Sequence, residues 1–232
     1  MVVRAGLVAV TLLLLAGVTS GPARGQEEGA PPPAAAPEAE LGALLRRFKG
    51  LPGLAARFRE ERRLALLEEP LVDEGRLYFA PPGRLARHVE RPSPSAVLIE
   101  ERRLRLWDGK ETREVPLDKS PVARELVAGF LLILAGDEPG LRRLYEVELR
   151  RLEGEDRWRL VLRPRAKPLL DAIARLEFVG QGLVVERMLL VETGGDETET
   201  TFSEVDPAHT FGPEEAARVF ALPQAVAVGR EE

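Results

Sequence analysis

Short runs of alternating apolar and polar residues dominate the chain from about residue 54 onwards, which predicts β-strands with one buried face. One such run places Leu77 and Phe79 between Arg76 and Tyr78. Turn signals separate the runs, among them Asp108-Gly109 and the segment 180–182, Gly-Gln-Gly. The pattern predicts about ten or eleven short antiparallel strands, each with one solvent-exposed and one apolar face.

Two segments show helical spacing instead. Apolar residues recur at steps of three and four over 41–48 and again over 121–134. Ser120 stands where it can cap the second helix, and Asp137 where it can cap a short helix that follows. Residues 130–134 read Phe-Leu-Leu-Ile-Leu and are apolar on every side of the helix. An ordinary surface helix carries polar residues on its outer face, so this helix is expected to pack against apolar matter.

The first 25 residues have the layout of a secretory signal peptide. One positive charge precedes an apolar run over 5–18, and small and polar residues follow. Ala23 and Gly25 are small residues at the −3 and −1 positions for cleavage after Gly25, and cleavage after Ser20 is the alternative. An uncleaved membrane anchor is the other interpretation, but the run is shorter than the roughly 20 residues that span a bilayer.

The sequence next to this run bears on localisation and domain boundaries. Residues 15–18, Leu-Ala-Gly-Val, match a bacterial lipoprotein cleavage box except that Val18 replaces the cysteine that carries the lipid. We therefore expect an exported protein without a lipid anchor, located in the periplasm. Residues 26–40 form a disordered linker rich in Pro and Ala, 41–222 the folded domain and 223–232 a flexible tail.

Composition and motifs point away from catalysis. The chain is 44% hydrophobic and 31% charged with a net charge of −5, as in a folded protein without a net basic surface for nucleic acid. It contains no cysteine, and its two histidines, His88 and His209, cannot form a three-histidine metal site. Phosphate-binding, dinucleotide and nucleophile-elbow motifs are missing from the sequence. We predict no catalytic residue, metal or cofactor, and we assign the charged strand residues to exposed sheet faces.

Two interpretations of the apolar sheet face remain open. In the first, which composition alone favours, helices cover a sheet with a filled core. In the second, a curved sheet and a helical lid enclose a cavity for an acyl chain. Burial contributes about 0.8 kcal/mol per methylene, so a chain of about 16 carbons gains at most about 12 kcal/mol before entropic costs. Binding without polar chemistry is therefore feasible.

A series of short motifs resembles the outer-membrane lipoprotein carrier family, LolA-like proteins, over residues 41–220. The matching positions are Ala56, Phe58 and Glu60; Gly75, Leu77, Phe79, Pro82, Gly83, Arg84 and Leu85; Asp108-Gly109; Leu134 to Asp137; and Trp158, Leu160, Leu162 and Pro164. The resemblance implies an unclosed antiparallel β-barrel of about eleven strands covered by a helical lid. It also implies a carrier that moves lipoprotein acyl chains across the periplasm.

The chain departs from the family pattern at two positions. Pro81 stands where a basic residue is usual, and Arg87 where an aromatic is common. The sequence is therefore similar to a divergent branch of the family, and its cargo is either a lipoprotein or another lipid.

The resemblance favours the second interpretation, in which the sheet and the helical lid enclose a lipid cavity. Its expected lining residues are Phe58, Leu77, Phe79, Leu85, Leu104, Leu106, Phe130, Leu134, Leu160, Leu162, Met188 and Leu190. The expected partners are the acyl chains of a lipoprotein or lipid, an inner-membrane donor complex and an outer-membrane acceptor, with the protein acting as a monomer. The alternative function is a periplasmic sensor or regulator that binds lipid or a protein partner with the same fold.

Overall fold

The computed structural model describes residues 37–100 and 103–222. The predicted signal peptide, the predicted tail and most of the predicted linker lie outside these residues. The described chain forms one antiparallel sheet of eleven strands with five α-helices and one short 3-10 helix. This confirms the predicted fold class.

The strands pair in the order β6-β5-β4-β3-β2-β1-β11-β10-β9-β8-β7. Their bounds are β1 Leu54–Arg63, β2 Leu71–Ala80, β3 Arg84–Arg91, β4 Ser95–Glu100, β5 Arg103–Trp107, β6 Thr112–Pro116, β7 Tyr145–Arg151, β8 Arg157–Pro164, β9 Ile173–Gln181, β10 Val184–Glu192 and β11 Glu197–Asp206. Two meanders, β1 to β6 and β7 to β11, thus meet where the first strand pairs with the last. β6 and β7 are the two edges, so the sheet does not close.

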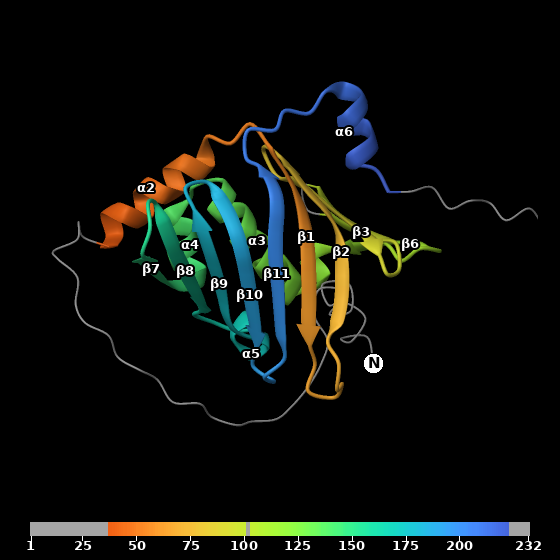
Figure 1. Cartoon of the computed structure of the whole chain (residues 1–232). Helices are drawn as coiled ribbons and strands as arrows, with labels where there is room; N and C mark the ends of the chain where they lie inside the picture. Colours follow the sequence, from red (N-terminus) through yellow and green to blue (C-terminus); the bar gives the residue numbers. More distant parts are fainter. Residues whose placement is uncertain (1–36, 101–102, 223–232) are drawn as a thin grey trace, which may run out of the picture.

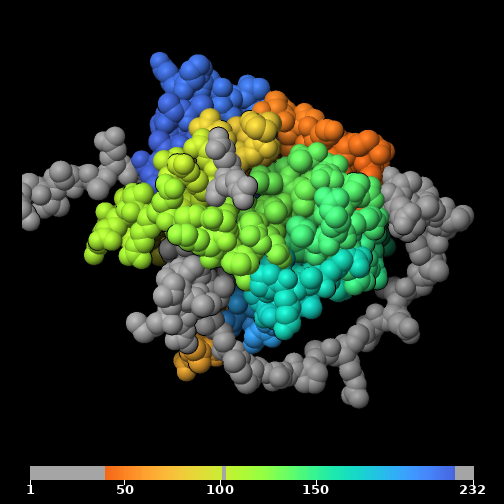
Figure 2. Space-filling model, turned by 180° about the vertical axis from the view of Figure 1, so that it is seen from behind, coloured from red at the N-terminus to blue at the C-terminus, as the bar shows by residue number. Residues whose placement is uncertain are grey.

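Helices α3 and α4 lie against one face of the sheet, and α6 lies apart from them (Figure 1). The bounds of the helices are α2 Pro37–Lys49, η1 Leu117–Lys119, α3 Pro121–Leu134, α4 Glu138–Leu144, α5 Leu169–Ala172 and α6 Pro213–Val219. Because η1, α3 and α4 run from edge strand β6 to edge strand β7, the chain crosses the open side of the sheet as helix. Seen from behind, α3 and α4 (green) fill this face between the yellow-green strands and the cyan segment around α5 (Figure 2).

The start of α4 follows from local chemistry. The Asp137 carboxylate accepts a hydrogen bond of 2.8 Å from the backbone N–H of Gly140, as the sequence predicts. The prediction for Ser120 is wrong, since its side chain makes no capping hydrogen bond to α3. Pro121 occupies the first turn of that helix and has no N–H to satisfy, which lowers the need for a cap.

Two element boundaries differ from those that the spacing and alternation of apolar residues predict. α2 begins at Pro37, four residues before the predicted start at Leu41, and buries its apolar face against the main core. Proline at a helix start costs no hydrogen bond, so the helix extends into the predicted linker. β1 ends at Arg63, although the apolar parity continues to Leu66, which is 78% exposed in the loop to β2.

A second, smaller core lies on the opposite face of the sheet from α3. There α6 places Val219 and Phe220 against Ala86 of β3 and Leu98 of β4. His88 of β3 also lies on this face and is half-buried. Its Nε2 lies 2.7 Å from the carbonyl oxygen of Val219, so the ring links β3 to α6.

Candidate functional site

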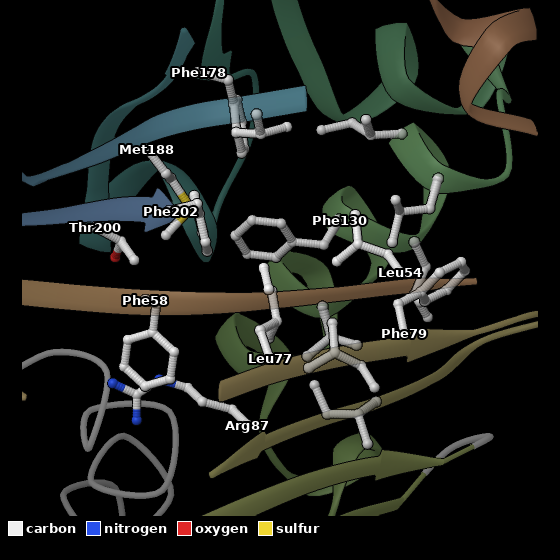
Figure 3. Close-up of a pocket in the computed structure, with 18 of the residues that line it drawn as sticks. Leu54, Phe58, Leu77, Phe79, Arg87, Phe130, Phe178, Met188, Thr200 and Phe202 are labelled. Atoms are coloured by element: carbon white, nitrogen blue, oxygen red, sulfur yellow. The ribbon is translucent and has the colours of Figure 1, made fainter. Parts of the chain in front are cut away.

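A cavity lies between the inner face of the sheet and helix α3 (Figure 3). The volume of the cavity, counted as the space that the centre of a water molecule can reach, is about 180 Å³. One water needs about 10–15 Å³ in this measure, so the space holds a molecule much larger than water. Its wall is almost entirely hydrocarbon.

Strands from both meanders and two helices build the wall. The contributing residues are Leu54, Ala56, Phe58 and Glu60 of β1; Leu77 and Phe79 of β2; Leu85 and Arg87 of β3; Val97 and Ile99 of β4; Leu104 of β5; Trp158 and Leu160 of β8; Phe178 of β9; Val185 and Met188 of β10; Thr200, Phe202 and Val205 of β11; Phe48 of α2; and Leu126, Val127, Phe130, Leu131, Ile133 and Leu134 of α3. Side chains two residues apart on one strand point to the same face, so strand alternation converts directly into a continuous apolar wall.

Nine of the twelve predicted lining residues lie on this wall. They are Phe58, Leu77, Phe79, Leu85, Leu104, Phe130, Leu134, Leu160 and Met188. The other three, Leu106, Leu162 and Leu190, share the parity of their lining neighbours and are buried in the main core. They do not border the cavity, because parity defines the face of a strand but not where along that face the space lies. Lipid contact by any of these residues stays a prediction.

Helix α3 contributes more of the wall than the sequence indicated. Besides Phe130 and Leu134, it presents Leu126, Val127 and Leu131 to the cavity. The helical spacing of these residues was visible in the sequence, but spacing does not tell which side of an all-apolar helix faces a space. Phe130 meets Phe178 of β9 edge to face, with ring centroids 5.9 Å apart, so this helix contacts the sheet through apolar groups.

Charged groups are buried at one end of the cavity. Glu60 of β1 is 1% exposed and accepts a hydrogen bond of 3.0 Å from Nη2 of Arg87 on β3 and one of 3.2 Å from the Thr200 hydroxyl on β11. Nε of Arg62 lies 3.8 Å from Glu60, and Nη2 of Arg62 donates to Asp73 at 2.9 Å. The prediction that charged strand residues lie on exposed sheet faces is therefore wrong for Glu60 and Arg87.

The side chain of Arg87 reaches across the neighbouring strand β2. Arg87 pairs with Leu77 on β2, and the next inward position of β2 is Gly75, which pairs with Phe58 of β1. The guanidinium extends past β2 and donates to Glu60 of β1. Its Cζ lies 4.3 Å from the centre of the Phe58 ring, a cation–π contact.

The environment of Glu60 opposes its ionisation. Burial raises the pKa of Glu60, while the nearby charges of Arg87 and Arg62 act in the opposite direction. The Glu60 pKa is raised on balance, because removing the carboxylate from water outweighs the attraction of the two cations. The sequence carried one signal for this group, since Glu60 and Arg62 interrupt the apolar parity of β1.

Neither histidine borders the cavity. His88 contacts α6, and the two ring nitrogens of His209 face Asp206 at 3.3 Å and Glu215 at 3.1 Å. Within residues 37–100 and 103–222, no three His, Asp or Glu side chains are grouped to hold a metal ion. In the same residues, no helix has the length and apolar character to cross a bilayer.

The family model described as "Outer membrane lipoprotein carrier protein LolA" matches residues 50–215. No curated protein sequence matches the chain significantly.

Several solved structures are similar at low sequence identity. A LolA superfamily protein from Nitrosomonas europaea is 9% identical, with a TM-score of 0.44 over 79% of this chain and 97% of that one. MucB in the MucA/MucB complex of Pseudomonas aeruginosa is 13% identical, with a TM-score of 0.46 over 75% of this chain and 59% of that one. The lipoprotein LppX of Mycobacterium tuberculosis is 10% identical, with a TM-score of 0.37 over 75% of this chain and 98% of that one.

Proposed function

Because the chain belongs to the LolA family of outer membrane lipoprotein carrier proteins, we propose that it is an exported, non-enzymatic carrier of acyl chains. In this proposal, the cavity between the sheet and α3 shields the acyl chains of a lipoprotein or another lipid. The protein then passes the lipid towards the outer membrane.

The apolar cavity is the observation that carries the proposal. About 25 cal/mol is released per Å² of apolar surface that leaves water, so a wall of hydrocarbon favours a hydrocarbon ligand. α3 packs on this space through apolar side chains such as Phe130. Such contacts are non-directional, and an acyl chain can replace them at small cost.

Transfer in this proposal needs no chemical step. The carrier receives its lipid from an inner-membrane donor complex and releases it to an outer-membrane acceptor that binds the lipid more tightly. It acts as a monomer, and its free energy of transfer comes from the difference between the two affinities. The signal peptide, residues 1–25, directs the chain to the periplasm and is removed.

Native mass spectrometry of the protein purified from its own periplasm tests the proposal. We expect a fraction of the protein to carry a non-covalent adduct with the mass of an acyl-bearing molecule, which collision energy releases. We also expect the stripped protein to take up a fluorescent fatty acid. Protein that is free of adducts and does not bind the probe would contradict the carrier function.

A further inference from the structure

We infer that the Glu60–Arg87 pair is a headgroup site at the end of the lipid cavity, where Arg87 binds an anionic group of the cargo, a carboxylate or a phosphate. This inference rests on the proposed function, because it requires that the cavity takes an acyl chain. It adds a preference for acidic lipids over neutral lipids of the same chain length.

The pair has the right place for a headgroup. Glu60, Arg87 and Thr200 are the polar residues on an otherwise apolar wall in the described part of the chain. In Figure 3, Arg87 and Thr200 lie at the same end of the cavity as Phe58, away from Leu54 and Phe79. An acyl chain along the apolar wall would therefore have its polar end beside this pair.

Within residues 37–100 and 103–222, the Arg87 guanidinium uses few of its hydrogen-bond donors. A guanidinium carries five N–H donors in a planar fork. Among the described residues, Glu60 is the one hydrogen-bond acceptor of this side chain, and Asp73 lies farther away at 3.9 Å. The stack on Phe58 orients the fork at 4.3 Å from the ring centre. A carboxylate or phosphate presents two oxygens that match such a fork.

The charge arrangement favours an anionic ligand over a cationic one. Both oxygens of Glu60 already accept hydrogen bonds, from Arg87 and Thr200, and the carboxylate is 1% exposed. Arg87 is the more accessible member of the pair, with 7% of its side chain exposed. A ligand headgroup that enters thus meets the N–H donors of Arg87 rather than a free carboxylate oxygen of Glu60.

Glu60 can compensate the charge of the ligand. Its carboxylate faces Arg87, Arg62, Asp73 and the Thr200 hydroxyl, and burial raises its pKa. When the guanidinium turns to an anion, Glu60 loses its main counter-charge and binds a proton more readily. The exchange keeps the number of buried charges unchanged, which avoids the cost of an additional unpaired charge.

Competition binding measures this preference. Hexadecanoate, hexadecyl phosphate and hexadecanol each displace the neutral probe N-phenyl-1-naphthylamine from the wild type and from Arg87→Met. We expect Arg87→Met to weaken the binding of both anions by about tenfold or more, because charge-assisted hydrogen bonds are lost. Hexadecanol binding should change less than about threefold, since methionine preserves the apolar stem.

A matched control removes a cation from the other side of the sheet. Arg76 lies on β2, its side chain is 45% exposed, and its Nε pairs with Glu90 at 3.0 Å. Arg76→Met lowers the net charge of the protein as Arg87→Met does. It should leave the affinities for all three ligands unchanged.

Two further variants separate binding from folding. Glu60→Gln frees the guanidinium and should tighten hexadecanoate binding relative to hexadecanol. The double variant Glu60→Gln/Arg87→Met leaves no buried charge of this pair, so it tests the preference if Arg87→Met alone does not fold. An unchanged ratio of acid to alcohol affinity in the folded Arg87 variants overturns the inference. Wild-type protein that binds the acid and the alcohol equally also overturns it but leaves the carrier proposal intact, whereas wild-type protein that binds none of the three ligands overturns the carrier proposal itself.

Discussion

Gly75 shows how one residue controls the spacing between neighbouring strands. It lies in β2 at a register shift between β2 and β3. A Cβ atom at this position would overlap the carbonyl oxygen of His88 and lie 2.9 Å from Cα of Val89. Both are backbone atoms of β3, which cannot move aside as a flexible side chain can.

We predict that Gly75→Ala lowers the free energy of unfolding by about 1–3 kcal/mol, the usual cost of overpacking. Gly212→Ala is the control for the added Cβ, because a Cβ there meets nothing within 4 Å and its φ of −67° suits alanine. Gly212 is the N-cap of α6, so the cost of this control is limited to the weaker cap that alanine makes. Urea unfolding measures both variants. Equal stability of Gly75→Ala and the wild type would contradict this role of Gly75.

Glu192 should make stability depend on pH. Burial, and after it the neighbouring Asp196, raises the pKa of Glu192 from 4.5 to about 7. Asp196 is 2% exposed, and its carbonyl oxygen accepts a hydrogen bond of 2.9 Å from the backbone N–H of Glu192. The folded state therefore favours the neutral form of Glu192.

The sign follows from a folded-state pKa above the unfolded one. The contribution of Glu192 to stability is complete below about pH 4.5 and is lost as the pH rises through about 7. Each pKa unit corresponds to about 1.4 kcal/mol, and partial exposure reduces this, so Glu192→Gln should be about 1–3 kcal/mol more stable than the wild type at pH 8. Urea unfolding at pH 5 and pH 8 measures the difference. A variant with the same pH dependence as the wild type would refute this assignment.

Among the elements, α3 combines two demands that usually exclude each other. It has to pack on a sheet, and in the proposed function it has to exchange those contacts for a ligand. Its polar anchoring is weak, since neither Ser120 nor any basic residue in its last turn supports its ends. Gly129 allows close approach to Tyr145 of β7, because a Cβ there would lie 2.5 Å from the tyrosine hydroxyl. Shape and apolar area therefore hold this helix in place.

We predict that Phe130→Glu weakens acyl-chain binding by about tenfold or more while the sheet stays folded. The new carboxylate would face the apolar wall, where an unpaired charge is costly. A fluorescent fatty-acid titration measures binding, and circular dichroism measures the β-structure. Arg124→Glu is the control, because Arg124 is 47% exposed on the same helix.

The outcomes of this test are distinct. Lost binding with retained β-signal supports α3 as a lid over the ligand. Lost β-signal would show that Phe130 is an ordinary core residue. Unchanged binding by a folded Phe130→Glu protein would contradict the lid assignment.

At the scale of the whole molecule, an unclosed sheet explains how one chain can hold a cavity without a separate domain. A strongly twisted sheet of eleven strands curls, and its two edges here are bridged by helices rather than by hydrogen bonds. The bridge can move without breaking a strand ladder. The outer face is protected in a different way, by α6 and its small core around Phe220.

The intact mass of the mature protein tests the expected export. We predict that residues 1–25 are missing and that no covalent lipid is attached, because Val18 replaces the cysteine needed for lipidation. Denaturing mass spectrometry of protein from the periplasm measures both. A mass that still includes residues 1–20, or that includes a lipid, would be inconsistent with this prediction.

Local patterns in the sequence determined most of the elements. Alternation and turn residues place the hairpins at Asp108-Gly109 and at 180–182, where the strands on either side pair as predicted. The Asp137 cap was predictable because its partner is Gly140, three residues away. Parity also identified the seven strand residues among the nine proposed residues that line the cavity, since every second side chain of a strand shares a face.

Only the tertiary structure decided which residues form the polar end of the cavity. Glu60 meets Arg87, 27 residues away, and Thr200, 140 residues away, because β1 is followed by β2 and β3 on one side and pairs with β11 on the other. A one-residue change in either register would turn one partner to the outer face. Alternation within a strand carries no information about that register or about which neighbour a strand has. The polar end of the cavity therefore arises from long-range strand pairing, whereas the local alternation of apolar and polar residues already predicts its apolar wall.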